Sequence, residues 1–312
     1  MSEVLSTNIR WALGVIFFIL MVSSLAVVIL PMVRRGVSMT ETRDRVHAWW
    51  IMAAVFTLAA FSPTLISLGL FALISYLALK EYFTLLPMRR VDRTLLFFTY
   101  LANPVQYLWV GLGWFGMFIV FIPVIMFVFL PIHLLLTGKP SGFIRSAGTL
   151  HWGLMATVFS LSHAAYLLRL PEGPQARSEA AGLLIFLVAL TEFNTVLQYW
   201  WGRAMPQIKM APRINPAKTW GGLAGGVMST VVIAMLAAPH LTPLSTAGAF
   251  WAGLLIAVAG FLGDLTISAL KRDLRIRQTG HYIPGHGGVL DRVDALSYTA
   301  PVFFHYLKFF IY

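Results

Sequence analysis

The sequence predicts an all-α protein that crosses a membrane about ten times (nine to ten) as a bundle of transmembrane helices. Of its 312 residues, 58% are hydrophobic and only 11% are charged. A soluble domain carries roughly 25% charged residues, so this chain has too few to cover a water-facing surface. The hydrophobic residues also occur in long blocks, and about 20 apolar residues in a helix match the thickness of the bilayer core.

The predicted spans follow one another along the chain, with proline, glycine and charged residues in the breaks. They cover residues 9–33, 48–62, 64–80, 94–110, 114–136, 149–168, 180–201, 222–239, 247–269 and 294–311. The first block is too long and too weakly basic for a cleaved signal peptide, so we expect it to be retained. The second and third blocks are short and could instead form one re-entrant pair. We expect residues 1–180 to be an N-terminal transmembrane scaffold and residues 181–312 to be a C-terminal transmembrane catalytic region.

The basic residues predict which side each loop faces. With the N-terminus outside, every one of the 23 Lys and Arg residues falls in a cytoplasmic loop, except Arg10, Arg169, Arg177 and Lys308. Such a bias predicts a multi-pass plasma-membrane protein, in bacteria an inner-membrane protein, with its functional loops in the cytoplasm. The net charge of +11 does not indicate nucleic acid, because the basic residues sit in short loops and no nucleic-acid-binding motif is present. The absence of cysteine excludes disulfides, thiolate metal sites and cysteine catalysis.

A polar stripe is predicted at the end of the ninth span. Asp264 lies inside or at the end of an apolar segment, where a carboxylate costs roughly 2–3 kcal/mol and is therefore a functional candidate. In a helix, Asp264, Ser268, Lys271 and Arg275 would share one face. The alternative is a set of charges that snorkel at a helix end, together with an Asp–Lys pair.

A glycine-rich segment at 280–294 is the second candidate. Its four glycines and one proline preclude a regular helix. Backbone N–H groups beside His286 and Arg292 would make a phosphate cradle. Asp291 and Asp294 supply the hard oxygen ligands that Mg²⁺ prefers. The alternative is a tight turn without a ligand.

Together these segments resemble the phosphatidate cytidylyltransferases, the family that makes CDP-diacylglycerol from CTP and phosphatidic acid. The family pattern Ser-x-x-Lys-Arg, followed later by His-Gly-Gly-x-x-Asp-Arg-x-Asp, is matched by Ser268, Lys271, Arg272, His286, Gly287, Gly288, Asp291, Arg292 and Asp294, with Pro284 ahead of the histidine. Upstream, the segment 215–222 resembles Ser-Pro-x-Lys-Thr-Trp-Glu-Gly, and the segment 199–203 resembles Tyr-x-x-Gly-Lys/Arg. The resemblance covers roughly residues 190–300.

The resemblance implies an enzyme of phospholipid biosynthesis that transfers CMP from CTP to phosphatidic acid, or to a related membrane phospholipid, and releases pyrophosphate. It implies catalytic roles for Asp264, Lys271 and Asp291, and a divalent metal site, with two Mg²⁺ ions, at Asp264 and Asp291. The implied substrate-binding residues are Lys218, Thr219, Ser268, Arg272, His286, Gly287, Gly288, Arg292 and Asp294. Metal ions and basic side chains would offset the repulsion between two phosphate-bearing reactants. We also expect a polar cavity that opens to the cytoplasm and sideways to lipid, and we consider a homodimer.

The sequence departs from the family pattern where carboxylates are expected. Gln278 replaces an Asp, Gly221 replaces a Glu and Thr195 replaces an Asp, while Asn215 replaces the opening Ser. A second hypothesis is therefore a catalytically degenerate paralogue that binds lipid or nucleotide as a membrane partner protein. A third is a transporter with a midplane ion site, which predicts broken helices in two related halves, whereas the polar residues here gather in one half.

Overall fold

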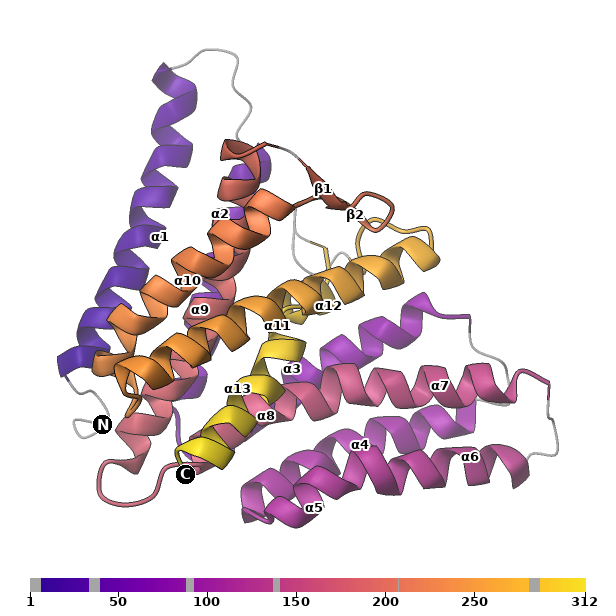
Figure 1. Ribbon diagram of the computed structural model, residues 1–312. Helices are drawn as coiled ribbons and strands as arrows, with labels where there is room; N and C mark the ends of the chain where they lie inside the picture. Colours follow the sequence, from indigo (N-terminus) through magenta and orange to yellow (C-terminus); the bar gives the residue numbers. More distant parts are fainter. Residues whose placement is uncertain (1–6, 34–39, 88–92, 137–140, 207, 281–286) are drawn as a thin grey trace.

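The computed structural model describes residues 7–33, 40–87, 93–136, 141–206, 208–280 and 287–312. Figure 1 shows a bundle of long helices with one small hairpin. The helices are α1 (Thr7–Val33), α2 (Thr40–Phe61), α3 (Thr64–Leu85), α4 (Arg93–Leu112), α5 (Phe115–Val120), α6 (Phe127–Leu136), α7 (Phe143–Gly153), α8 (Ser160–Tyr166), α9 (Ala176–Ala204), α10 (Trp220–Leu241), α11 (Thr246–Asp273), α12 (Leu290–Val293) and α13 (Leu296–Phe310). Strands β1 (Lys209–Ala211) and β2 (Asn215–Thr219) pair in antiparallel fashion.

The predicted all-α, multi-spanning architecture is confirmed. Within the described part of the chain, seven helices or helical runs are long and apolar enough to cross a membrane. These are α1, α3, α4, the run from α5 to α6, α9, α10 and α11. The remaining predicted spans correspond to α2, to the run from α7 to α8 and to α13. The third predicted span, 64–80, was too short, because α3 has 22 residues and ends at Leu85.

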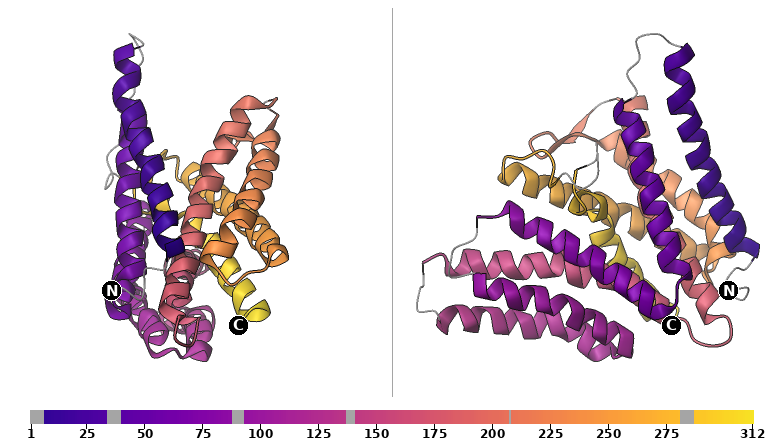
Figure 2. Two further views of the ribbon diagram at one scale, coloured as in Figure 1. Left: turned by 90° about the vertical axis from the view of Figure 1, so that its left-hand side faces the viewer. Right: turned by 180° about the vertical axis from the view of Figure 1, so that it is seen from behind.

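The C-terminal helices pack on one another in chain order. Helix α9 contacts α10, α10 contacts α11, and α11 contacts α13, while α13 also contacts α8 and α9. Figure 2 shows the pair α1 and α2 standing beside this group. The hairpin connects the end of α9 to the start of α10, away from the end of the bundle at which α13 finishes (Figure 1).

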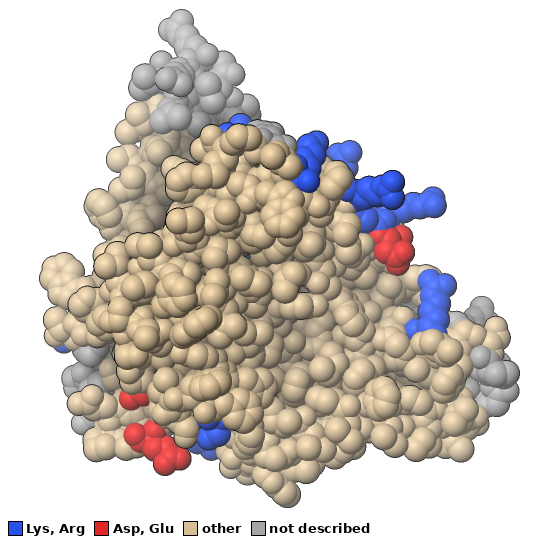
Figure 3. All heavy atoms as spheres, viewed as in Figure 1, with Lys and Arg blue, Asp and Glu red and all other residues tan. Residues whose placement is uncertain are grey.

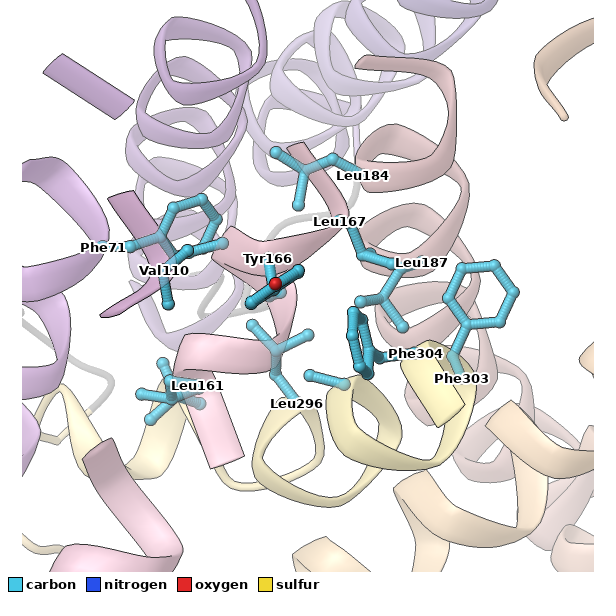
Figure 4. Packing of buried hydrophobic residues seen from close by; sticks show 14 of the residues in the cluster. Phe71, Val110, Leu161, Tyr166, Leu167, Leu184, Leu187, Leu296, Phe303 and Phe304 are labelled. Atoms are coloured by element: carbon cyan, nitrogen blue, oxygen red, sulfur yellow. The ribbon is translucent and has the colours of Figure 1, made fainter. Parts of the chain in front are cut away.

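A buried apolar cluster joins the N-terminal helices to α9 and α13. Figure 4 shows Tyr166 of α8 surrounded by Leu296, Phe304 and Leu187. Phe303 and Phe304 are both fully buried, and the ring of Phe304 lies 5.2 Å from that of Tyr166. Aromatic rings at such distances contribute favourable packing beyond their buried area. The cluster fixes α13, and therefore the loop that precedes it, against the rest of the bundle.

Helices α9 and α10 approach closely because small residues line their contact. A Cβ added to Gly226 would overlap the side chain of Gln198, and one added to Gly222 would meet its carbonyl oxygen at 2.6 Å. The spacing Gly222-x-x-x-Gly226 therefore serves helix packing, as glycine pairs at this interval often do in membranes.

Side-chain caps begin α10, which follows the hairpin, and α11. The Thr219 hydroxyl accepts a hydrogen bond from Gly222 N at 3.0 Å at the start of α10. The Ser245 hydroxyl accepts one from Gly248 N at 3.2 Å at the start of α11. Such caps satisfy backbone N–H groups that have no partner in the first helical turn.

Candidate active site

The hairpin and α11 meet in an ion pair. Lys218 Nζ, on β2, lies 2.5 Å from Asp264 Oδ2, on α11. The side chains are only 13% and 18% exposed, so water screens their attraction less than it would at a surface. The Ser268 hydroxyl donates to the other oxygen of Asp264 at 3.3 Å, from one helical turn further along. Asp264 and Ser268 therefore share one face of α11, as the sequence predicts.

Two further contacts hold the hairpin on α11. Asn215 Nδ2 donates to the Ser268 hydroxyl at 3.1 Å. Arg272 Nε donates to the carbonyl oxygen of Ile214 at 2.9 Å. Asn215, which replaces the family's serine, thus bridges the two segments. Ser268 and Arg272, predicted to bind substrate, contact the hairpin that carries Lys218.

A buried polar chain extends from Lys218 into α9. Lys218 Nζ donates to Gln198 Oε1 at 3.0 Å, and Gln198 Nε2 donates to Asn194 Oδ1 at 3.1 Å. Asn194 also accepts from Thr230 and donates to a backbone carbonyl of α11. A satisfied network of this kind holds its members in one geometry. Asn194 and Gln198 therefore belong to a structural hydrogen-bond cluster that supports Lys218.

A second ion pair joins the last turn of α11 to α12. Lys271 Nζ lies 2.7 Å from Asp291 Oδ1. Asp291 Oδ2 accepts from Thr279 N at 2.8 Å, from the Thr279 hydroxyl at 2.9 Å and from Gly288 N at 3.3 Å. Burial acts to raise the pKa of Asp291, but the Lys271 ammonium and the hydrogen bonds from Thr279 hold that pKa below its ordinary value.

Two glycines of the predicted phosphate loop, Gly287 and Gly288, lie against carboxylates of the protein. Gly287 has φ +79°, and an added Cβ there would overlap Asp291. An added Cβ on Gly288 would overlap Glu81 of α3. The Leu290 N–H donates to Glu81 Oε2 at 3.0 Å. The backbone N–H groups of Gly288 and Leu290, near the predicted cradle, are thus used by Asp291 and Glu81 in this structure.

Asp294 and Arg292 follow within the same turn. Burial and the nearby Asp264 carboxylate raise the pKa of Asp294 to about 8, against the opposite effect of Lys271 and Arg292. Ala295 N donates to Asp294 Oδ1 at 2.6 Å. Arg292 also interacts electrostatically with Glu192 of α9. Charges from α9, α11 and the 287–294 turn therefore converge on one region.

The carboxylates partly fit a magnesium site. Each predicted ligand, Asp264 and Asp291, is paired with a lysine, and the described residues contain no group of three or more His, Cys, Asp or Glu side chains arranged for a metal. Asp264 and Asp294 lie close enough for their charges to repel each other. Mg²⁺ commonly uses one or two carboxylates together with substrate phosphates and water. The donor set suits a metal that arrives with a nucleotide, and the two Mg²⁺ ions remain a prediction.

The structure corrects part of the predicted stripe on α11. The helix ends at Asp273, and Arg275 has φ +57°, so Arg275 is not on the face shared by Asp264 and Ser268. Lys271 pairs with Asp291 rather than with Asp264. A short helical turn, α12, also occupies part of the glycine-rich segment.

The other predicted residues have varied positions. Thr219 is buried and caps α10, so its hydroxyl is already used within the protein. His286 lies outside the described residues. The predicted cavity, its opening to lipid and the homodimer stay predictions.

Glu81 was not predicted as a site residue from the sequence. Glu81 is 2% exposed and lies in α3, within the region expected to be scaffold. The only signal was a carboxylate in an otherwise apolar stretch, next to Lys80. Such a residue in a membrane helix is a functional candidate by default, the argument that selected Asp264.

The three positions that lack family carboxylates have different surroundings. Thr195 and Gln278 are exposed. A Cβ on Gly221 would meet Met205 Cβ at 2.7 Å, so Met205 packs where a larger side chain would begin. The chain therefore has space for acidic groups at the first two positions and none at the third without movement of Met205.

Exposed basic residues surround the hairpin and the end of α11. Figure 3 shows Lys and Arg side chains gathered on this shoulder of the molecule, beside a surface that is otherwise nearly free of charge. The exposed basic side chains here are Arg203, Lys209, Arg213, Arg272, Arg275 and Arg277. A cluster of this kind raises the local concentration of anions.

Comparison with known proteins identifies a family and several relatives. The model of the cytidylyltransferase family matches residues 43–310. An uncharacterized protein of Escherichia coli strain K12, YnbB, is 43% identical over 272 residues, which are 87% of this chain and 89% of YnbB. The phosphatidate cytidylyltransferase of Brucella abortus is 36% identical over 121 residues, 39% of this chain and 45% of that protein. The phosphatidate cytidylyltransferase of Haemophilus influenzae is 36% identical over 135 residues, which are 41% of this chain and 46% of that protein.

The match to these two enzymes thus spans about half of their length, whereas the family model spans most of this chain. The region that the family model matches includes α11, the hairpin, Glu81 and both Lys–Asp pairs. The chain belongs to the cytidylyltransferase family.

Proposed function

We propose that this protein transfers CMP from CTP to phosphatidic acid, or to a related membrane phospholipid, and forms CDP-diacylglycerol and pyrophosphate. The proposal depends on two ion pairs, Lys218–Asp264 and Lys271–Asp291. They bring two ammonium groups and two carboxylates into one partly buried region. Family membership and the named relatives support the same reaction class.

The reaction needs this mixture of charges. An oxygen of the lipid phosphate forms a bond to the α-phosphorus of CTP, while the bond from that phosphorus to the β-phosphate oxygen breaks and pyrophosphate leaves. Both reactants are anions, so their approach is opposed by repulsion until cations offset it. Lys218, Lys271 and Arg292 supply fixed positive charge. Positioning and electrostatic stabilisation account for most of the catalysis in phosphoryl transfer.

Each ion pair can exchange its partner. When CTP binds, Lys218 and Lys271 move their charge from the carboxylates to phosphate oxygens. Asp264 and Asp291 would then be the residues that hold Mg²⁺, with Asp294 near Asp264. The metal, when bound, would neutralise the triphosphate and stabilise the charge of the leaving pyrophosphate.

The lipid can remain in the bilayer during the reaction. Asp264 lies near the end of a spanning helix, and the exposed basic residues follow directly beyond it. This is the depth of the phosphate headgroups when the acyl chains occupy the bilayer core. We place this end of the molecule on the cytoplasmic face of the plasma membrane, where CTP is present.

The test is a direct assay of the full chain in vesicles. Purified protein is incubated with Mg²⁺, labelled CTP and phosphatidic acid, and both CDP-diacylglycerol and pyrophosphate are measured. We expect both products in equal amounts, and no product in EDTA. Asp264→Asn should abolish the reaction, whereas Asp273→Asn, an exposed acid on the same helix, should not. Failure to form a CDP-lipid with any of several anionic phospholipids would disprove the proposal.

A second candidate is binding without turnover. It is favoured by the identities of Thr195, Gln278 and Gly221, where the family pattern has carboxylates. Binding of CTP with Mg²⁺ but no pyrophosphate release, under conditions in which a Brucella or Haemophilus relative is active, would support this candidate over the first.

A further inference from the structure

The contact between Glu81 and the glycine-rich turn links two distant parts of the chain. Glu81 lies near the end of α3, and the turn lies more than half of the sequence further on. Glu81 Oε2 accepts the Leu290 N–H at 3.0 Å. The carboxylate is 2% exposed, and Oε1 has no hydrogen-bond partner among the described residues.

The same carboxylate fills the space beside two glycines. A Cβ added to Gly288 would overlap Glu81, and all three of the atoms nearest to that Cβ belong to the Glu81 carboxyl group. A Cβ added to Gly280 would also overlap Glu81 Oε1. Gly287 is a different case: its positive φ and its close contact with Asp291 explain why that position is a glycine. Gly288 has no positive φ, so its backbone would accept any residue.

We infer that Glu81 is a positioning residue of the site: its carboxylate holds the turn at 287–290, and glycine is required at 288 to admit that carboxylate. A larger residue at 288 would push the Glu81 side chain away from the Leu290 N–H. The turn would then lose the contact that orders it, although no ligand had been touched.

Consequences for the reaction follow from the neighbours of the turn. Gly288 N also donates to Asp291 Oδ2, and Asp291 pairs with Lys271. Movement of the turn therefore displaces a carboxylate and an ammonium that the proposed function assigns to metal and phosphate. This consequence rests on the proposed function, whereas the contact between Glu81 and the turn does not. Small displacements of such groups are costly, about 100-fold for a shift near 1 Å.

The experiment is a double-mutant cycle between Glu81→Ala and Gly288→Ala in the full chain in detergent. The first readout is hydrogen–deuterium exchange of the peptide that contains the Leu290 amide. We expect each single variant to raise exchange about tenfold and the double variant to raise it no further, because both remove one contact. Gly69→Ala is the control: Gly69 is on α3 with open space beside its Cα, so its effect should simply add to that of Glu81→Ala.

The second readout separates positioning from general instability. The Michaelis constant for CTP should rise about tenfold in Glu81→Ala and Gly288→Ala, while that for phosphatidic acid stays within about twofold. Glu81→Gln keeps an oxygen acceptor for the Leu290 N–H, so its constant for CTP should stay close to that of the wild type. If Glu81→Ala does not fold, Glu81→Ser takes its place in the cycle, because serine is too short to reach the Leu290 N–H or to fill the space beside Gly288.

Each outcome decides one question. Gly288→Ala effects of equal size with and without Glu81 would overturn the inference and assign the glycine to ligand approach instead. Unchanged exchange at Leu290 in Glu81→Ala would overturn it as well. A wild type that makes no CDP-lipid would disprove the proposed function only, because the exchange measurements need no substrate.

Discussion

Lys218 Nζ lies 2.5 Å from Asp264 Oδ2, so an exposed hairpin is fastened to a spanning helix by the charges that the reaction would use. Lys218 also donates to Gln198 and lies over the ring of Phe261. These contacts hold the ammonium beside α11, where a phosphate oxygen would replace the Asp264 carboxylate in the proposed reaction.

Replacement of Lys218 by methionine should reduce kcat/KM for CTP by roughly 100- to 1,000-fold, because one fixed positive charge is lost where negative charge concentrates. Steady-state kinetics in vesicles measures the effect. Lys209→Met, on the same hairpin but exposed, is the matched control and should change kcat/KM by less than about twofold. Equal losses in the two variants would show that Lys218 acts only through general surface charge.

Removal of both members of the Lys271–Asp291 pair should destabilise the chain by less than the sum of the two single removals. The two side chains are 19% and 5% exposed, so either charge left alone is poorly solvated. Lys271→Met and Asp291→Asn should each lower the melting temperature, and the double variant should lose less than the sum of the two. Thermal unfolding in detergent measures this. Strict additivity would mean that the pair contributes nothing to the folded state.

Stability in metal-free buffer should fall as pH rises towards 8. The pKa of Asp294 is raised to about 8 from 3.8. The folded state therefore holds a proton that the unfolded state has released, so this group stabilises the fold at low pH and its contribution is lost as pH approaches 8. Thermal unfolding in EDTA, from about pH 5 to about pH 8, should show this slope, and Asp294→Asn should flatten it. A variant with the same slope as the wild type would contradict the assignment.

Restoring the family carboxylates tests whether the chain has lost activity. Gln278 is an exposed loop position, so Gln278→Asp should be accepted without loss of stability, whereas Thr195→Asp places a carboxylate on an exposed face of the spanning helix α9 and should cost roughly 2–3 kcal/mol. Gly221→Glu requires movement of Met205 and is best combined with Met205→Ala. If the chain is catalytically degenerate, the restored variant should release pyrophosphate from CTP many times faster than the parent. An already active parent with no gain on restoration excludes degeneration.

The predicted orientation can be tested because the chain has no cysteine. Single cysteines at Arg213 and Arg275, both exposed near the site, should react with an impermeant maleimide only from the cytoplasmic side. A cysteine at exposed Glu172, in the turn before α9, should react only from the opposite side. Labelling of whole cells and of inverted vesicles distinguishes the two. The reverse pattern would place the site outside and away from CTP.

The spanning helices could be predicted because hydrophobic length is a local property of the sequence. The block 247–269 anticipated α11, which extends only four residues further, to Asp273. Length alone could not show the π-helical turns Phe121–Met126 and Leu154–Phe159, since these depend on packing between neighbours. The hairpin was also missed, because two short strands leave little pattern in the sequence.

The site could be predicted only as a set of segments. Spacing along one helix placed Asp264 beside Ser268. The same reasoning could not assign Lys218 to Asp264 or Lys271 to Asp291, since those pairs form between segments whose relative positions depend on the whole bundle. Glu81 was missed for the same reason. Its partner, Leu290, is far away in sequence, and one carboxylate in an apolar block carries no information on what it will contact.

Thr219 both caps α10 and directly follows Lys218, so a substitution there affects the helix and the lysine together. Its hydroxyl starts α10, and its peptide bond carries Lys218. A substitution of Thr219 that disorders the first turn of α10 would also displace the Lys218 ammonium. Serine keeps the hydroxyl that caps the helix, so we expect it to be the one tolerated replacement. The order of these two residues, a lysine followed directly by a helix-capping threonine, therefore couples the position of a charge to the start of a helix.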